Sequence, residues 1–255
     1  YFRKTFRINK PVKQAKAYIC GLGFYEMYLN GERVGDQVLA PAVTNFDRRP
    51  LKKMLYFFDD QSNQRVLYNT FDVTSLVQKA ENTVGVLLGN GWYNQRDRTV
   101  EGCMWYDTPR LLCQLEIEYT DGSTELVVTD DSWKTTTGPL LHDAIFTGEE
   151  YDARLELDGW NRNGYKDSSW KKALLVRAPK GSLHAQLAPH EKIIRILQPV
   201  SCEQKDDSTY WYAFPEMISG WAHIKVQGNA GDRIKLRFVG EEKNDFGQVD
   251  LYTLR

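Results

Sequence analysis

The stretch Leu111–Val128, with the sequence LLCQLEIEYTDGSTELVV, alternates between apolar and polar residues up to Tyr119. Every odd-numbered position is apolar, and the even-numbered ones after the second residue are Gln or Glu. This period of two is typical of a β-strand with one buried face. Asp121-Gly122 then predicts a two-residue turn, because both turn positions tolerate positive φ. With Leu126 and Val128 on the return strand, the stretch predicts an antiparallel hairpin.

Two more stretches of the chain repeat this hairpin pattern. Phe24–Val34 is expected to fold back at Asn30-Gly31, and Ile224–Phe238 at the glycine-rich residues 228–231. In the second of these, Arg and Lys alternate with apolar residues, which predicts a basic outer face. Further strands are expected at Lys16–Cys20, Val66–Val73, Thr83–Leu88 and Tyr210–Phe214. Because helical signals are limited to single turns near 74–77 and 167–170, the chain is predicted to be all-β.

The chain is expected to divide into two β units. Gly159-Trp160 and Asp167–Trp170 are typical of a closing segment, and residues 178–182 then combine Pro, Gly and Ser. The strand pattern restarts after them. We therefore predict a jelly-roll-like β-sandwich over 1–178 and a second, smaller β-sandwich unit over 183–255, short enough to be truncated.

The charge balance and the hydropathy of the chain exclude several classes of protein. The sequence has 33 Lys+Arg against 34 Asp+Glu, a net charge of −1, which argues against nucleic acid as a partner. Its longest uncharged stretch, Asn82–Gln95, is too polar to span a bilayer, so no membrane partner is expected. The first residue is Tyr1 rather than Met, and no signal peptide follows it, which suggests an excised or processed piece.

No residue set for catalysis or zinc binding stands out in the sequence. The four cysteines form no CxxC pair and are expected to be buried thiols. The alternative is that two of them form one disulfide. Motifs for a serine nucleophile, a P-loop or a zinc protease are missing. The five pairs of adjacent acidic residues are expected to be solvated, because neighbours on a strand point to opposite faces.

A polar and aromatic constellation is the strongest candidate for a binding site. The apolar run Thr83–Leu88 ends in Gly89–Asn94, with the sequence GNGWYN, and Asn45–Arg48 is a second such cluster. A flat aromatic face with amide, carboxylate and guanidinium groups is typical of sugar recognition. The alternative is that the aromatic rings fill the core and the amides bond the loops, and composition favours it. The candidate ligand-binding residues are Asn45, Asp47, Arg48, Asn90, Trp92 and Tyr93.

Several motifs together resemble one family of enzymes. The chain is similar over nearly its whole length, and in the same order, to the N-terminal non-catalytic β domains of bacterial α-L-rhamnosidases of glycoside hydrolase family 78. The motifs that carry the resemblance are Ile19–Asp36, Thr70–Thr74, Val86–Tyr93, Gly148–Arg154, Asp167–Trp170, Ala185–Pro189, Ser219–Trp221, Gly228–Gly231, Leu236–Phe238 and Glu241-Glu242. Two segments depart from the family pattern: residues 50–64 are an insertion, and Ala213–Met217 lacks the usual amides.

The resemblance implies an accessory role in a larger enzyme. The parent would be an inverting α-L-rhamnosidase whose catalytic (α/α) barrel follows Arg255, so this chain is expected to be inactive alone. It would bind L-rhamnose-containing carbohydrate, with no required cofactor and with calcium as an option at Asp47. Alternatively, it would be a scaffold that packs against the catalytic domain through Glu149, Asp152 and Arg154. A small independent enzyme is the last alternative. A bacterial periplasm or cell surface is the favoured location.

Overall fold

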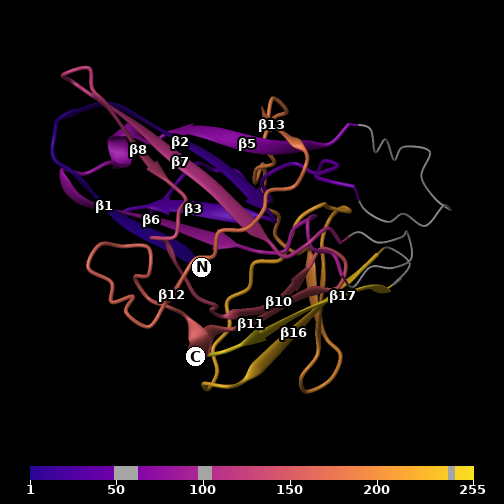
Figure 1. Cartoon of the computed structure of the whole chain (residues 1–255). Helices are drawn as coiled ribbons and strands as arrows, with labels where there is room; N and C mark the ends of the chain where they lie inside the picture. Colours follow the sequence, from indigo (N-terminus) through magenta and orange to yellow (C-terminus); the bar gives the residue numbers. More distant parts are fainter. Residues whose placement is uncertain (49–62, 97–104, 241–244) are drawn as a thin grey trace.

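The computed structural model describes residues 1–48, 63–96, 105–240 and 245–255, and in these residues it is almost entirely β (Figure 1). The prediction of an all-β fold is confirmed. Two one-turn 3-10 helices, η1 (Thr74–Leu76) and η2 (Ala153–Leu155), interrupt the strands. The strands are β1 (Phe2–Ile8), β2 (Val12–Leu22), β3 (Tyr25–Leu29), β4 (Glu32–Arg33), β5 (Arg65–Asp72), β6 (Ala80–Leu88), β7 (Arg110–Tyr119), β8 (Thr124–Val128), β9 (Lys134–Thr135), β10 (Leu140–Ala144), β11 (Gly148–Asp152), β12 (Lys171–Lys172), β13 (Ser182–Ala185), β14 (Ser201–Gln204), β15 (Tyr210–Ala213), β16 (Arg233–Val239) and β17 (Asp245–Thr253).

The first part of the chain forms a β-sandwich. One sheet has the order β12-β9-β1-β6-β3-β4, the other β13-β5-β2-β7-β8, and Figure 1 shows the two as stacked layers. Alternate residues of each strand face the space between the layers, so that one apolar core forms there. Its fully buried members include Ile19, Met27, Leu29, Leu115 and Ile117. Within the described residues, no helix is long and apolar enough to cross a membrane.

The hairpin that opened the sequence argument is formed by β7 and β8. Cys113, Leu115 and Ile117 are buried as predicted, and Gly122 takes a φ of +80° in the turn. On β8, however, Val127 is buried, whereas Leu126 and Val128 are exposed. The register explains this, because Val127 pairs with Leu115, and paired residues share a face of the sheet.

The other two predicted hairpins have different outcomes. Asn30-Gly31 forms the expected turn between β3 and β4, with φ of +55° and +89°. The strand Arg233–Val239 and its basic outer face are also confirmed. The strand expected at 224–226 is wrong, because those residues join no sheet and β16 pairs with β17 instead.

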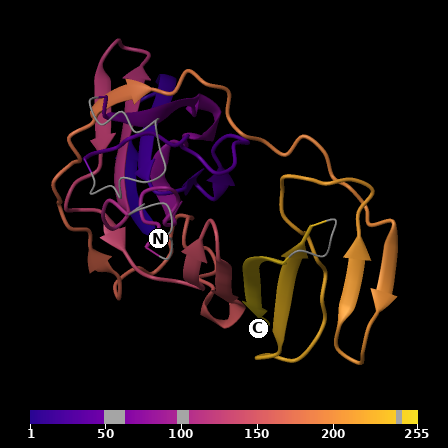
Figure 2. The ribbon, with the colours of Figure 1, turned by 90° about the vertical axis from the view of Figure 1, so that its right-hand side faces the viewer.

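Strands from both predicted units share sheets. The order of the third sheet is β10-β11-β17-β16, so that β11 from before residue 178 lies parallel to β17 from near the chain end. In the same way β13 adds to the sandwich as a parallel neighbour of β5. Figure 2 shows the third sheet extending away from the sandwich on this side. Each of these two sheets thus contains strands from both sides of residues 178–183. The division of the chain there stays a prediction.

The segment between the sandwich and β16 has no core of its own. None of the residues from 171 to 240 is buried, and all of them are described. β12, β13 and β16 of this segment belong to larger sheets. Its two remaining strands, β14 and β15, form a two-stranded sheet of their own, which lies farthest from the sandwich in Figure 2. An isolated strand pair is marginally stable in water at best.

The described cysteines are free thiols, but the expectation that they are buried is wrong for Cys202, which lies on the two-stranded sheet that has no core. Cys20 and Cys113 are buried and Cys202 is exposed, and none of these three is in a disulfide. Burial raises the pKa of both buried thiols to about 12, so they stay protonated and unreactive at neutral pH. Cys103 lies outside the described residues.

Candidate functional site: a cavity over Trp160

The two loops predicted from the sequence to bind a ligand do meet, through their aromatic rings. Phe46 contacts Tyr93 edge to face, with ring centroids 5.4 Å apart, and Tyr106 stacks on Tyr93 at 5.5 Å. Together with Cys20 and Val66 these rings belong to a second buried cluster. The side chain of Tyr93 is only 2% exposed, and burial raises the pKa of its hydroxyl. This ring therefore fills a core rather than facing a ligand.

Hydrogen bonds of its backbone and of the Asp47 carboxylate hold the Asn45–Arg48 loop within the protein. The carbonyl of Asn45 accepts a hydrogen bond from Arg65 N at 2.9 Å. Asp47 accepts one from its neighbour Arg48 N at 2.7 Å and one from Lys180 N at 3.2 Å. These bonds tie the loop to β5 and to the segment before β13. In the described part of the chain no three His, Cys, Asp or Glu side chains are placed to hold a metal ion.

Asn90 is fixed by the carboxylate of Asp143, which precedes β11. Asn90 N donates to both carboxylate oxygens at 2.9 and 3.0 Å, and its side-chain amide donates to the carbonyl of Asp143 at 2.8 Å. Burial raises the pKa of Asp143 more than these bonds lower it. Asn90 and Asp143 line a small cavity of about 190 Å³. Nearby, Trp92 is half-buried against Phe146.

The three residues predicted to meet a catalytic domain lie on β11 and η2. Asp152 accepts a bond from Arg154 N at 3.1 Å and pairs with the Arg154 guanidinium at 2.6 Å, so it caps η2. This hydrogen bond holds the pKa of Asp152 below its usual range. Glu149 N donates to Asp250 of β17 at 3.0 Å. Burial, followed by the charges of Asp250 and Asp143, raises the pKa of Glu149.

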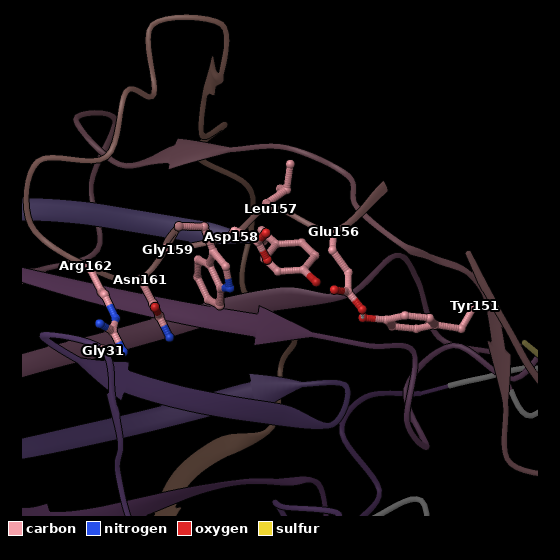
Figure 3. Close-up of a pocket in the computed structure, with 10 residues that line it drawn as sticks. Gly31, Tyr151, Glu156, Leu157, Asp158, Gly159, Asn161 and Arg162 are labelled. Carbon is pink, nitrogen blue, oxygen red and sulfur yellow. Dashed lines mark hydrogen bonds between the residues drawn. The ribbon is translucent and has the colours of Figure 1, made fainter. Parts of the chain in front are cut away.

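A larger cavity lies where the loop after η2 crosses the sandwich (Figure 3). It has a volume of about 430 Å³ and combines aromatic rings with carboxylate, amide and guanidinium groups. Its lining residues are Tyr1, Gly31, Tyr151, Glu156, Leu157, Asp158, Gly159, Trp160, Asn161 and Arg162.

Arg3 of β1 holds the loop that carries this cavity. Its side chain is only 2% exposed. It donates to the carbonyl of Trp160 at 2.9 Å and to that of Arg162 at 3.2 Å, and it pairs with Asp167. Lys134 contacts the other oxygen of the same carboxylate at 2.6 Å. Burial acts to raise the pKa of Asp167, but Lys134 and Arg3 outweigh it and keep that pKa below its usual value.

The indole of Trp160 is seated on a strand that lacks a side chain at the contact. A Cβ added to Gly85 of β6 would lie 2.7 Å from Trp160 Cζ3, so only glycine leaves room for the ring. Tyr1 and Tyr28 contact the indole edge to face, with centroids 4.7 and 5.7 Å away. Neither tyrosine therefore stacks parallel to the indole, and both hold it through perpendicular ring contacts.

The polar groups of the cavity lie at two ends. At one end the Tyr151 hydroxyl donates to Glu156 at 3.1 Å, and burial with the Glu156 charge raises the pKa of that hydroxyl. Arg255 pairs with Glu156 at 2.8 Å and with Asp158 at 3.1 Å. At the other end, beside Gly31, Figure 3 shows the side chains of Asn161 and Arg162 next to each other.

The sequence contains a signal for this cavity that we interpreted differently. Trp160-Asn161-Arg162-Asn163 joins an aromatic ring to amides and a guanidinium, as do the two predicted loops. In the sequence Gly159-Trp160 is typical of a closing segment, whereas in the structure both residues line the cavity. The ring becomes part of a cavity only through Arg3 and Gly85, which are remote in the sequence.

Comparison with known proteins identifies the family. The model of the family described as "Alpha-L-rhamnosidase N-terminal domain" matches residues 10–57 and 58–195. The chain belongs to this family. Among curated relatives it is 34% identical over 241 residues to an α-L-rhamnosidase of Formosa agariphila, covering 92% of this chain and 24% of the relative. Another from Streptomyces avermitilis is 31% identical and shares 99% of this chain and 23% of its own length.

Solved structures agree with the assignment to the rhamnosidase N-terminal family. The α-L-rhamnosidase of Dictyoglumus thermophilum matches with a TM-score of 0.85 and 36% identity, over 100% of this chain and 27% of that one. The Streptomyces avermitilis enzyme complexed with L-rhamnose matches with a TM-score of 0.86 and 29% identity, over 99% of this chain and 24% of that one. The chain thus spans about a quarter of the length of the curated relatives it matches.

Proposed function

We propose that the chain is the accessory, non-catalytic N-terminal part of an α-L-rhamnosidase that removes terminal L-rhamnose from glycans or glycosides. Its role there is to dock against the rest of the enzyme. One observation carries the docking role: none of the residues from 171 to 240 is buried. A segment that buries so little apolar surface cannot offset the entropy of its own ordering, so it needs a partner surface.

The composition of this segment supports an apolar partner surface. Its most exposed large apolar side chains are Ile194 at 96% and Leu187 at 92%, followed by Leu174 and Ile196. Large apolar side chains exposed along one segment favour an interaction site there. The partner that we propose is the rest of the same enzyme, because the α-L-rhamnosidases that the chain matches are about four times its length.

Replacing Ile194 and Ile196 with Ser in the full-length protein tests this docking. If both side chains are buried against the rest of the enzyme, the change is expected to cost about 3–6 kcal/mol. Thermal unfolding should begin at a lower temperature than in the wild type, and turnover of an aryl α-L-rhamnoside should fall after mild heating. The matched control is Leu126→Ser on β8, an equally apolar but solvent-facing site, where a change within about 0.5 kcal/mol is expected. Equal behaviour of the two variants, or turnover by the 255-residue chain alone, would contradict the proposal.

A second candidate role is carbohydrate binding at the loops predicted from the sequence. The observation in its favour is the contact of Phe46 with Tyr93, which makes the two predicted clusters neighbours. Asp47 keeps lone pairs that are able to hold calcium beside a sugar. Calorimetric titration with L-rhamnose, with and without calcium, tests this role on the wild type and on Asp47→Ala and Trp92→Ala. Saturable heat that both variants weaken would favour it, and unchanged heat in both would argue against it.

A further inference from the structure

We propose that the cavity over Trp160 is a binding site for one neutral sugar residue, a pyranose ring with one apolar C–H face. Neither the sequence motifs nor the family match assigns a ligand to this cavity. The inference goes beyond the docking role and rests on the proposed function only in the choice of L-rhamnose as the probe. It is argued from the floor of the cavity, its two polar ends, its charge and its size.

We call the indole of Trp160, which lines the cavity, its floor. Trp160 contacts Gly85, and its two aromatic neighbours, Tyr1 and Tyr28, lie nearly perpendicular to it, so neither of these rings stacks parallel to the indole. Among the described residues no acceptor bonds the indole N–H. A pyranose ring meets both needs, because its C–H face packs on an aromatic ring while its hydroxyls accept and donate hydrogen bonds.

The walls of the cavity offer donors at one end and acceptors at the other. The Asn161 amide and the Arg162 guanidinium lie together beside Gly31, and neither side chain has a hydrogen-bond partner among the described residues. At the opposite end, Glu156 and Asp158 supply carboxylate oxygens. Hydroxyls around a sugar ring are both donors and acceptors, so a single sugar can use both ends.

The charge of the cavity favours a neutral ligand. Arg162 lies at one end of the cavity, and Arg255 pairs with the two carboxylates at the other end, those of Glu156 and Asp158. The four charges sum to zero, and Arg255 offsets one of the two negative charges at the acidic end. For a phosphate or a carboxylate ligand, attraction to Arg162 at one end would be offset by repulsion from the carboxylates at the other. A neutral polyhydroxylated ring has no such conflict.

The size and the rigidity of the cavity also fit a single sugar. Its volume of about 430 Å³ lies near the lower end of the roughly 300–1,000 Å³ of small-molecule sites. The loop is fixed by the contacts of Arg3 before any ligand arrives, which lowers the entropy cost of binding. Because the lining is largely polar, an apolar segment of the rest of the enzyme fits it less well.

The test follows Trp160 itself in the full-length protein labelled with 5-fluorotryptophan. The Trp160 signal is assigned by its loss in Trp160→Phe. Titration with L-rhamnose is expected to shift this signal in a saturable way, with a dissociation constant on the order of 1 mM. Asn161→Ala and Arg162→Gln should each weaken binding by about 3- to 10-fold, because each removes a hydrogen-bonding group whose side chain has no protein partner to lose. Trp211→Ala, on the distant β15, is the matched control and should leave the affinity unchanged.

Several outcomes would overturn the inference. One is a Trp160 signal that does not move with L-rhamnose, D-galactose or D-glucose, which would leave the cavity to another part of the enzyme. Another is a shift of the same size with glycerol, a polyol without a ring face. Unchanged affinity in both Asn161→Ala and Arg162→Gln would also contradict it. These outcomes differ from failure of the proposed function, which would show as no rhamnosidase turnover or no effect of the Ile194 and Ile196 substitutions.

Discussion

Alanine in place of Gly23 is expected to destabilise the sandwich by about 3–5 kcal/mol. Gly23, in the turn between β2 and β3, has a φ of +129°, a backbone conformation that disfavours any side chain. An added Cβ would also lie 2.1 Å from the carbonyl oxygen of Gly89. That oxygen belongs to the backbone after β6, so relief of the clash requires the two loops to separate. Urea unfolding of the chain and the variant measures the loss.

The control for this substitution is Gly122→Ala in the turn between β7 and β8. Gly122 also has a positive φ, +80°, but an added Cβ there meets nothing within 4 Å. Its expected cost is therefore the backbone strain alone, about 1–2 kcal/mol. If Gly23→Ala cost no more than Gly122→Ala, the close approach of the two loops would not contribute to stability. A larger loss for Gly23→Ala separates the clash from the strain.

The contact at Gly23 also explains why the predicted loops lie where they do. Gly91 has a φ of +47°, and a Cβ on it would lie 2.5 Å from Phe24 N. The loop after β6 and the turn after β2 thus pack backbone against backbone. Glycine pairs such as Gly21/Gly23 and Gly89/Gly91 are typical of turns, because glycine tolerates positive φ. The sequence could not predict that the turns touch, since the contact depends on how β2, β3 and β6 are arranged.

Local patterns predicted the strands well and their partners less well. The alternation in Leu111–Tyr119 and the Asn30-Gly31 turn are properties of adjacent residues, and both are confirmed. The hairpin at Ile224–Phe238 failed because its second strand found a partner later in the chain, in β17. Its first strand has the right alternation but no neighbouring strand and no buried face. An alternating pattern indicates that a segment can form a β-strand, but it does not predict which other strand will pair with it.

The candidate site was harder to predict than the fold for the same reason. Tyr93 follows a strand end and two glycines, so its sequence context resembles that of a ligand-facing ring, but Phe46 and Tyr106 enclose it. Trp160 has a similar context and lines a cavity instead. The difference between the two aromatic residues is made by remote neighbours. Arg3 holds Trp160 from 157 residues away in the chain.

Arg3→Met is expected to cost about 3–5 kcal/mol and to release the loop that carries Trp160. The methionine is similar in length and apolar, so it fills the space but leaves the carbonyls of Trp160 and Arg162 without their donors. Asp167 also loses its buried partner and keeps only Lys134. Urea unfolding measures the stability, and the fluorine signal of Trp160 reports the release of the ring.

Lys134→Met is the matched control, because Lys134 contacts the same carboxylate from a more exposed position. An exposed ion pair contributes about 0–1 kcal/mol, so this variant should unfold close to the wild type and leave the Trp160 signal in place. If Arg3→Met were no more destabilising than Lys134→Met, the seat of Trp160 on Gly85 and the two tyrosines would be enough to hold the loop. If instead only Arg3→Met moves the Trp160 signal and also abolishes the response to L-rhamnose, one buried guanidinium both stabilises the sandwich and forms the cavity.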